Sequence, residues 1–203
     1  MAVAAIVLAA GDGRRVGRPK AWLTVHDRSF LEHVVDSALA AGISTIVGVV
    51  DPHQLEAREV LERLARRPRF SWTRGRAPER GPIDSLVAGL DALATPHDVL
   101  VWPVDHVGVA EETVRAIVNA GQERRNVAVV PQWNDRGGHP VWLPASWCAS
   151  LRELPMAGTL RDVLRARIAQ VDRLVVEDAW VTRDVDTLDE LEAVRRAMAE
   201  RSR

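Results

Sequence analysis

Apolar runs alternate with amphipathic stretches along almost the whole chain. The continuous apolar runs predict buried strands at 3–8, 43–50, 70–73, 99–104, 127–131, 141–143 and 171–176. The stretches between them predict helices at 29–41, 52–66, 85–93, 111–120 and 160–168, with a last helix after Thr187. Continuous apolar strands that are separated by helices are typical of a parallel sheet covered on both faces. The strand–turn–strand pattern over 127–143 predicts one antiparallel insertion in that sheet.

Polar residues at the expected helix starts support these boundaries. Ser29 with Glu32, and Thr187 with Glu190, have the spacing of a capping box. In such a box the two side chains satisfy each other's free backbone N–H groups at the first turn. Asp84 stands directly before the helix expected at 85–93 and can cap it.

The most informative segment is the loop that follows the first strand. Residues 8–20 read Leu-Ala-Ala-Gly-Asp-Gly-Arg-Arg-Val-Gly-Arg-Pro-Lys. Gly11, Gly13 and Gly17 permit positive φ, and successive free N–H groups in such a loop form an anion-binding concavity. The loop also carries four cations that can bind phosphate oxygens, namely Arg14, Arg15, Arg18 and Lys20. This combination indicates a polyphosphate ligand.

Three other interpretations of this loop are weaker. A plain surface turn rarely carries three glycines at the end of a buried strand. A dinucleotide site would begin with Gly11-x-Gly13, but the third glycine comes one residue too late, although Glu32 and Asp36 lie near the expected distance for its acidic residue. A P-loop is excluded because no G-x-x-x-x-G-K-[ST] segment occurs.

Carboxylates follow two of the other predicted strands. Asp105 ends the apolar run 99–104, and Asp184 and Asp186 follow the last strand, where alternation points them the same way. Ligands of open parallel sheets bind at the carboxyl ends of the strands, and Mg²⁺ takes one or two carboxylates plus phosphate oxygens. Asp105 with Asp184 or Asp186 is therefore the candidate metal site. The alternatives are that Asp105 caps the next helix and that Asp186 only supports the cap at Thr187.

Composition narrows the remaining possibilities. We expect the 203 residues to form a single domain, residues 1–203, and the net charge of −1 gives no basic field for nucleic acid. No apolar stretch is long enough to span a membrane, and 2–10 is interpreted as the first strand rather than a signal sequence. The single Cys148 fits a reducing, cytoplasmic compartment and a buried apolar role.

Two further enzyme classes lack their motifs. No H-x-x-x-H or C-x-x-C accompanies His106 and His139, which argues against a zinc site. No G-x-S-x-G segment is present, which argues against a serine hydrolase.

At this point the motifs carry a resemblance. The loop at 8–20 resembles the signature loop of the MobA-like NTP transferase family, which includes the enzymes that attach CMP or GMP to the molybdenum cofactor. Segments 81–90, 103–106, 138–141 and 184–191 resemble, in family order, the nucleobase segment, the metal-carboxylate strand end, the acceptor motif of the cytidylyltransferase branch and the closing motif. The resemblance implies a Rossmann-like three-layer α/β/α nucleotidyltransferase fold, with a mostly parallel sheet and one antiparallel strand. It also implies transfer of NMP from an NTP to a phosphorylated acceptor, with release of pyrophosphate.

The resemblance implies roles for individual residues as well. Arg15 and Lys20 would neutralise charge at the α- and β-phosphates, and Asp105, with Asp184 or Asp186, would hold Mg²⁺. The residues implied at the nucleotide are Leu8, Ala9, Ala10, Gly11, Asp12, Gly13, Arg14, Gly17, Gly81, Asp84 and Ser85. Those implied at the acceptor are His139, Trp142 and Arg161, in a pocket that we also expect Trp133 and the segment 156–161 to line.

Finer features of the sequence favour a particular nucleotide base and a particular acceptor. The Ala-Ala-Gly form of the loop resembles pyrimidine-nucleotide enzymes more than the Ala-Gly-Gly form of guanylyltransferases, which favours CTP. The tryptophans expected in the acceptor pocket could stack on a pterin-like ring or could equally be core residues. Molybdopterin is the first candidate acceptor, with a sugar phosphate or another phosphorylated metabolite as the alternative. Two other functional classes stay open at this stage: a catalytically silent nucleotide-binding module and a dehydrogenase.

Overall fold

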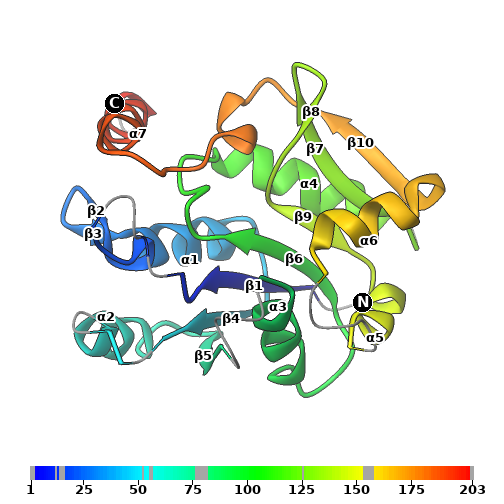
Figure 1. Ribbon diagram of the computed structural model, residues 1–203, viewed down its shortest axis with the longest axis horizontal. Helices are drawn as coiled ribbons and strands as arrows, with labels where there is room; N and C mark the ends of the chain where they lie inside the picture. Colours follow the sequence, from blue (N-terminus) through cyan, green and yellow to red (C-terminus); the bar gives the residue numbers. More distant parts are fainter. Residues whose placement is uncertain are drawn as a thin grey trace.

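One mixed sheet forms the centre of the molecule (Figure 1). The computed structural model describes residues 3–11, 13, 17–51, 53–54, 57–75, 82–124, 126–152 and 158–201. The sheet strands are β1 (Val3–Ala9), β4 (Thr45–Val50), β5 (Phe70–Arg74), β6 (Asp98–Pro103), β7 (Ala128–Trp133), β8 (Arg136–Gly137), β9 (Val141–Leu143) and β10 (Val171–Val175). Their order is β10-β7-β9-β6-β1-β4-β5, with β8 paired to β7. A separate small hairpin joins β2 (Thr24–Val25) to β3 (Arg28–Ser29).

The directions of the strands confirm the predicted fold class. β1 pairs in parallel with both β4 and β6, β4 with β5, and β7 with β10. β9 runs antiparallel between β6 and β7, and β8 turns back on β7 as a short hairpin. The turn of this hairpin contains Asn134 and Asp135, both with positive φ. The strand–turn–strand pattern over 127–143 therefore does produce the antiparallel insertion.

Helices cover both faces of the sheet and give three layers (Figure 1). One core lies under α1 (Phe30–Ala40), α2 (Ala57–Leu64), α4 (Glu111–Glu123) and α7 (Leu188–Arg201). The other lies under α3 (Pro82–Asp91), α5 (Ala145–Leu151) and α6 (Leu160–Ala166). Alternation along β6 supplies both cores, because Leu100 and Trp102 belong to the first and Val99 and Val101 to the second. Short 3₁₀ turns are η1 (Lys20–Trp22), η3 (Ile168–Gln170) and η4 (Ala179–Thr182).

Both predicted capping boxes form at the expected residues. Ser29 Oγ accepts from Glu32 N at 3.2 Å while Glu32 Oε2 accepts from Ser29 N at 2.8 Å. The Thr187–Glu190 box has the same reciprocal pair at 3.3 and 2.8 Å. These local hydrogen bonds fix where α1 and α7 begin.

Two expectations about helices are wrong. α3 begins at Pro82, so Asp84 lies inside its first turn and is not its cap. Pro is favoured in the first helical turn because its missing N–H has no partner there in any case. α5 was not anticipated, because its seven residues are too few to display a helical period.

The tryptophans and the single cysteine are mainly core residues. Trp102 and Trp142 are among the largest fully buried side chains. Burial raises the pKa of the Cys148 thiol to about 11, so that it stays protonated and apolar in character. No helix within the described part of the chain has the length and apolar character needed to cross a membrane.

Candidate active site

The site lies at the carboxyl ends of β1 and β6, where two loops leave the sheet side by side. Leu8 is in register with Pro103, and Val104 N donates to Leu8 O at 3.0 Å. The glycine loop leaves β1 and returns to η1, which begins at Lys20. The segment that holds Asp105 leaves β6. Parallel pairing therefore brings together two segments that lie far apart in the sequence.

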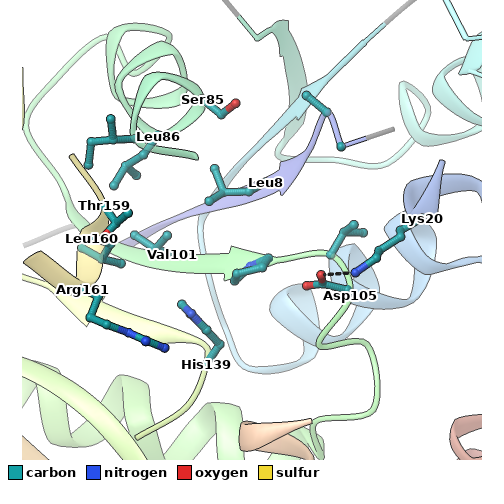
Figure 2. A pocket seen from close by; sticks show the side chains of 15 residues that line it. Leu8, Lys20, Ser85, Leu86, Val101, Asp105, His139, Thr159, Leu160 and Arg161 are labelled. Atoms are coloured by element: carbon teal, nitrogen blue, oxygen red, sulfur yellow. Dashed lines mark hydrogen bonds and ion pairs between the residues drawn. The ribbon is translucent and has the colours of Figure 1, made fainter. Parts of the chain in front are cut away.

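A cavity of about 610 Å³ opens at this edge (Figure 2). The lining residues are Leu8, Ala10, Gly11, Lys20, Ile83, Ser85, Leu86, Val101, Pro103, Val104, Asp105, His139, Thr159, Leu160 and Arg161. This size is within the usual range of small-molecule sites. Eight residues predicted for the nucleotide, the chemistry or the acceptor are among them: Leu8, Ala10, Gly11, Lys20, Ser85, Asp105, His139 and Arg161.

The glycines of the loop behave in different ways. Gly13 and Gly17 adopt positive φ, at 58° and 76°. A Cβ on Gly13 would collide with the backbone of Arg18, whereas a Cβ on Gly11 would meet no atom within 4 Å. Gly13 is thus required by the loop itself, and Gly11 leaves open space at the mouth of the cavity. Asp12, Arg14, Arg15 and Gly81 lie outside the described residues.

Lys20 lies between two of the predicted metal carboxylates. Its Nζ donates to Asp105 Oδ2 at 2.8 Å and also to Asp186 Oδ1. Burial lowers the pKa of Lys20, but attraction and hydrogen bonds from Asp105 and then Asp186 outweigh it and raise that pKa above its ordinary value. The ammonium group is therefore charged at neutral pH.

Asp105, Asp184 and Asp186 form an acidic cluster. Each offers one carboxylate oxygen, and these oxygens lie within 4.8 Å of one another. Asp105 Oδ1 is buried and has no hydrogen-bond partner among the described residues. An unpaired buried carboxylate oxygen is costly unless a ligand satisfies it. Three hard oxygen donors at this spacing fit a divalent cation such as Mg²⁺. Alternation had left the choice between Asp184 and Asp186 open, and the structure brings both close to Asp105.

Backbone contacts hold the C-terminal carboxylates beside Asp105. Val185 N donates to Asp105 O at 3.1 Å, so the segment between η4 and α7 is tied to the end of β6. Glu190 Oε2 accepts from Asp186 N at 2.8 Å. Upstream, the buried Asp178 accepts from Ala110 N at 2.8 Å, which fixes the same segment to the start of α4.

His139 lies between the cavity and the core. Its ring centroid is 4.9 Å from that of His106, and its backbone N donates to Val181 O at 2.7 Å. Burial is the main cause that lowers the pKa of His139 to about 3, with the neighbouring His106 second. His139 is therefore neutral at physiological pH and can offer a ring nitrogen, but no charge, to a ligand.

Several predicted site residues lie away from the cavity. Trp142 is 1 % exposed, and a Cβ on Gly121 of α4 would collide with its ring, so it packs in the core. Trp133 packs against the core and under Arg183. The expected stacking surface for an acceptor is therefore absent at both tryptophans. Ala9 is buried in β1, and Asp84 is buried within α3.

The apolar wall of the cavity was not anticipated. Val101 of β6 and Ile83 and Leu86 of α3 line it, as Figure 2 shows for Val101 and Leu86. Their sequence signal is that of ordinary core residues, because the same periodicity places side chains in the core and along a cavity wall. Gly75 packs against two residues of the cavity lining. A Cβ on Gly75 would come within 3.3 Å of Ala10 and 3.5 Å of Ser85 Oγ.

The three-layer α/β fold, with a glycine loop and a lysine–carboxylate cluster at one sheet edge, defines a nucleotidyltransferase. The chain belongs to the MobA-like NTP transferase domain family, whose model matches residues 5–173. No curated protein sequence matches the chain significantly. Family membership argues against the dehydrogenase alternative.

Solved structures similar to this chain agree with the fold. Rv0371c from Mycobacterium tuberculosis is 25 % identical, with a TM-score of 0.77 over 97 % of this chain and 99 % of that one. Another structure of that protein, in complex with manganese, is matched at 23 % identity and a TM-score of 0.73, over 97 % and 99 % of the two chains. A nucleotidyl transferase from Methanothermobacter is 19 % identical, with a TM-score of 0.79 over 98 % of both chains.

Proposed function

We propose that this chain transfers CMP from CTP to a phosphorylated small molecule in a Mg²⁺-dependent reaction that releases pyrophosphate. The observation that carries the proposal is that Lys20 and Asp105 line the cavity and that Lys20 joins Asp105 to Asp186. An oxygen of the acceptor phosphate attacks the α-phosphorus of the nucleotide. The bond from the α-phosphorus to the β-phosphate oxygen breaks, and pyrophosphate leaves with its electron pair. Preorganised charge is the main protein contribution to such transfers.

Different residues of the chain are proposed to bind the triphosphate, to supply positive charge and to hold the metal ion. The glycine loop, with Gly11 at its open side, receives the triphosphate. Lys20 supplies positive charge where negative charge develops, and Arg15 is proposed to act with it. Asp105, Asp184 and Asp186 would hold Mg²⁺ through their clustered oxygens. When bound, the ion polarises the phosphates and neutralises the leaving pyrophosphate. The manganese complex of the Mycobacterium relative supports a divalent ion here.

The choice of CTP rests on the Ala-Ala-Gly form of the glycine loop and on the packing around Gly75. A Cβ on Gly75 would come within 3.3 Å of Ala10 and 3.5 Å of Ser85 Oγ, so Gly75 keeps the space beside both residues small. A pyrimidine needs less width than a purine, and the Ser85 hydroxyl can pair with a base edge. Rejection of a wrong base is strongest where it leaves a buried polar group unpaired.

The acceptor enters from the side of His139 and Arg161, which line the cavity away from Ser85 (Figure 2). Molybdopterin is the first candidate because of the family's acceptor motif at 138–141. Since Trp133 and Trp142 do not line the cavity, an aromatic stacking contact no longer favours it over a sugar phosphate. Thr159 and Leu160, from the segment expected at the acceptor, do line the cavity.

A panel of nucleotides against acceptors tests the proposal. CTP, UTP, GTP and ATP are each combined with molybdopterin, a sugar 1-phosphate and no acceptor, with Mg²⁺ or with EDTA, and pyrophosphate release is measured. We expect release with CTP, Mg²⁺ and an acceptor, and none with EDTA. Faster release with GTP or UTP would overturn the choice of base. Release with the sugar phosphate alone would overturn molybdopterin, and no release in any combination would overturn the proposed reaction.

A further inference from the structure

A second cavity of about 370 Å³ adjoins the first and has a strongly basic lining. It is bounded by the β7–β8 hairpin, the edge strand β10 and α6. Four arginines line it: Arg136, Arg161, Arg165 and Arg173. None of the lining residues is an aspartate or glutamate. Four like charges that converge without a carboxylate repel one another unless an anion binds among them.

Within the described part of the chain, the charged contacts of these arginines are few. Arg165 and Arg161 help to lower the pKa of the Asp162 carboxyl, after the hydrogen bonds from Thr159, but form no salt bridge with it. Other exposed arginines, such as Arg58, Arg115 and Arg152, are paired with nearby carboxylates. No salt bridge to a described residue involves any of the four that line the second cavity. Guanidinium groups in this state are available to an external anion, and Arg is well suited to phosphate and carboxylate because it donates two parallel hydrogen bonds.

The backbone is shaped to admit these side chains. A Cβ on Gly137 would collide with the guanidinium of Arg173, so glycine at that position lets Arg173 lie across the hairpin. Gly138 is packed against the backbone of Val181, where a Cβ would also collide. These two glycines therefore place the hairpin close to both β10 and η4 and keep the floor of the cavity open.

The two cavities adjoin at three residues that line both of them, His139, Leu160 and Arg161. The reacting centre, with Lys20 and Asp105, belongs to the first cavity alone. Arg136, Arg165 and Arg173 belong to the second alone. A phosphate that attacks the nucleotide must lie in the first cavity, so the arginines of the second cannot serve that same phosphate.

We infer that the acceptor carries a second anionic group, a phosphate or a carboxylate, at the end remote from its nucleophilic phosphate. This favours a sugar phosphate or another phosphorylated metabolite over molybdopterin, whose single phosphate is the nucleophile. This group binds among Arg136, Arg165 and Arg173, while Arg161 spans the junction between the cavities. The inference rests on the proposed function for the direction of the acceptor. The existence of an anion site in the second cavity does not depend on it.

The first experiment measures anion binding by the full chain without any reaction. Inorganic phosphate is titrated calorimetrically into the wild type, R165Q/R173Q and the matched control R58Q/R115Q at ionic strength near 0.1 M. The control removes the same charge from exposed helix positions, and charges beyond about 10 Å are screened at this salt concentration. We expect R165Q/R173Q to raise the Kd for phosphate at least about tenfold, because two charge-assisted contacts are lost. The control should change this Kd less than about twofold. R136Q/R165Q serves as a second variant, and thermal unfolding checks that each variant is folded.

The second experiment places the site in the reaction. KM values are measured for acceptors with and without a second anionic group. R165Q/R173Q should raise the KM of the doubly anionic acceptor about tenfold or more, and leave the KM of the nucleotide and of the singly anionic acceptor unchanged.

Equal phosphate binding in wild type and R165Q/R173Q would overturn the inference, whatever the activity. Weakened phosphate binding with unchanged acceptor KM would overturn the acceptor assignment. Absence of transfer with every acceptor would count against the proposed function, while the phosphate titration still decides the anion site.

Discussion

The Lys20 ammonium group joins carboxylates that come from the middle and the end of the chain. It contacts Asp105 and Asp186, which lie 85 and 166 residues away in sequence. Lys20 is also the single lysine of the chain, in which every other strong base is arginine. A compact ammonium group can lie between two carboxylates and turn to a phosphate, whereas the planar guanidinium of arginine needs more space and a fixed direction.

We expect Lys20→Ala to lower kcat for transfer by about 10²–10³, because it removes a preorganised charge at the transferring phosphate. Lys20→Arg should fail to restore the rate, since the larger fork does not fit between Asp105 and Asp186. Pyrophosphate release at saturating nucleotide measures both variants. Turnover near the wild-type rate in Lys20→Ala would show that the lysine only neutralises the acidic cluster.

The acidic cluster gives a second prediction at the residue scale. Asp105→Asn should weaken Mg²⁺ activation most, because it removes charge from the residue whose Oδ1 is buried and unpartnered among the described residues. Asp186→Asn should follow, and Asp184→Asn, at the most exposed of the three positions, should have the smallest effect. The Mg²⁺ concentration for half-maximal activity is the measurement. An unchanged value in Asp105→Asn would contradict its role as a metal ligand.

At the scale of elements, α1 and α2 are joined by a charged contact. Arg63 of α2 donates from Nε to Glu32 Oε1 at 2.9 Å and from Nη2 to Oε2 at 3.2 Å. Burial raises the pKa of Glu32, but Arg63 and the Ser29 capping bonds outweigh it and bring that pKa down to about 2, from an ordinary value of 4.5. The contact therefore links a local helix cap to the packing of a second helix.

Because the pKa of Glu32 is lower in the folded state than in the unfolded state, the stability that this contact contributes depends on pH. The stabilisation from Glu32 is complete above pH 4.5 and is lost as the pH falls toward 2. The free energy of unfolding should drop in that window by roughly 3 kcal/mol at most from this group. Glu32→Gln should flatten this dependence, whereas Glu62→Gln, at an exposed site on α2, should not. Urea unfolding between pH 2 and 6 measures both, and equal acid dependence in wild type and Glu32→Gln would refute the linkage.

At the scale of the whole molecule, the sheet order decides what meets at the active edge. β1 lies between β4 and β6, so the glycine loop leaves the sheet next to the Asp105 segment on one side and Gly75 on the other. The antiparallel β9 then carries the chain from the 138–140 segment back into the sheet beside β6 (Figure 1). This arrangement places His139 between a cavity for the reacting phosphates and an arginine-lined cavity. An acceptor with an anionic group at each end, as we infer, would reach from the first cavity to the second past His139.

The sequence alone determined the features that depend on local chemistry. Apolar runs predicted the longer strands of the sheet and capping boxes predicted the starts of α1 and α7, because each signal lies within a few residues. The glycine loop with Lys20 predicts an anion site for the same reason. The position of Asp105 at the carboxyl edge of the sheet was also predictable from its place after a strand. Asp184 and Asp186 reach it because the segment after η4 returns from the end strand β10 to the end of β6. The family resemblance added their roles.

Only the tertiary structure decided which side chains reach the cavities. Trp142 and Val101 lie in neighbouring apolar strands with similar patterns, yet the first packs in the core and the second lines the active cavity. The pairing of Lys20 with two carboxylates and the convergence of Arg136 with Arg173 likewise leave no local trace. The physical reason is that periodicity fixes the face on which a side chain lies, whereas strand order and helix packing fix what lies opposite that face.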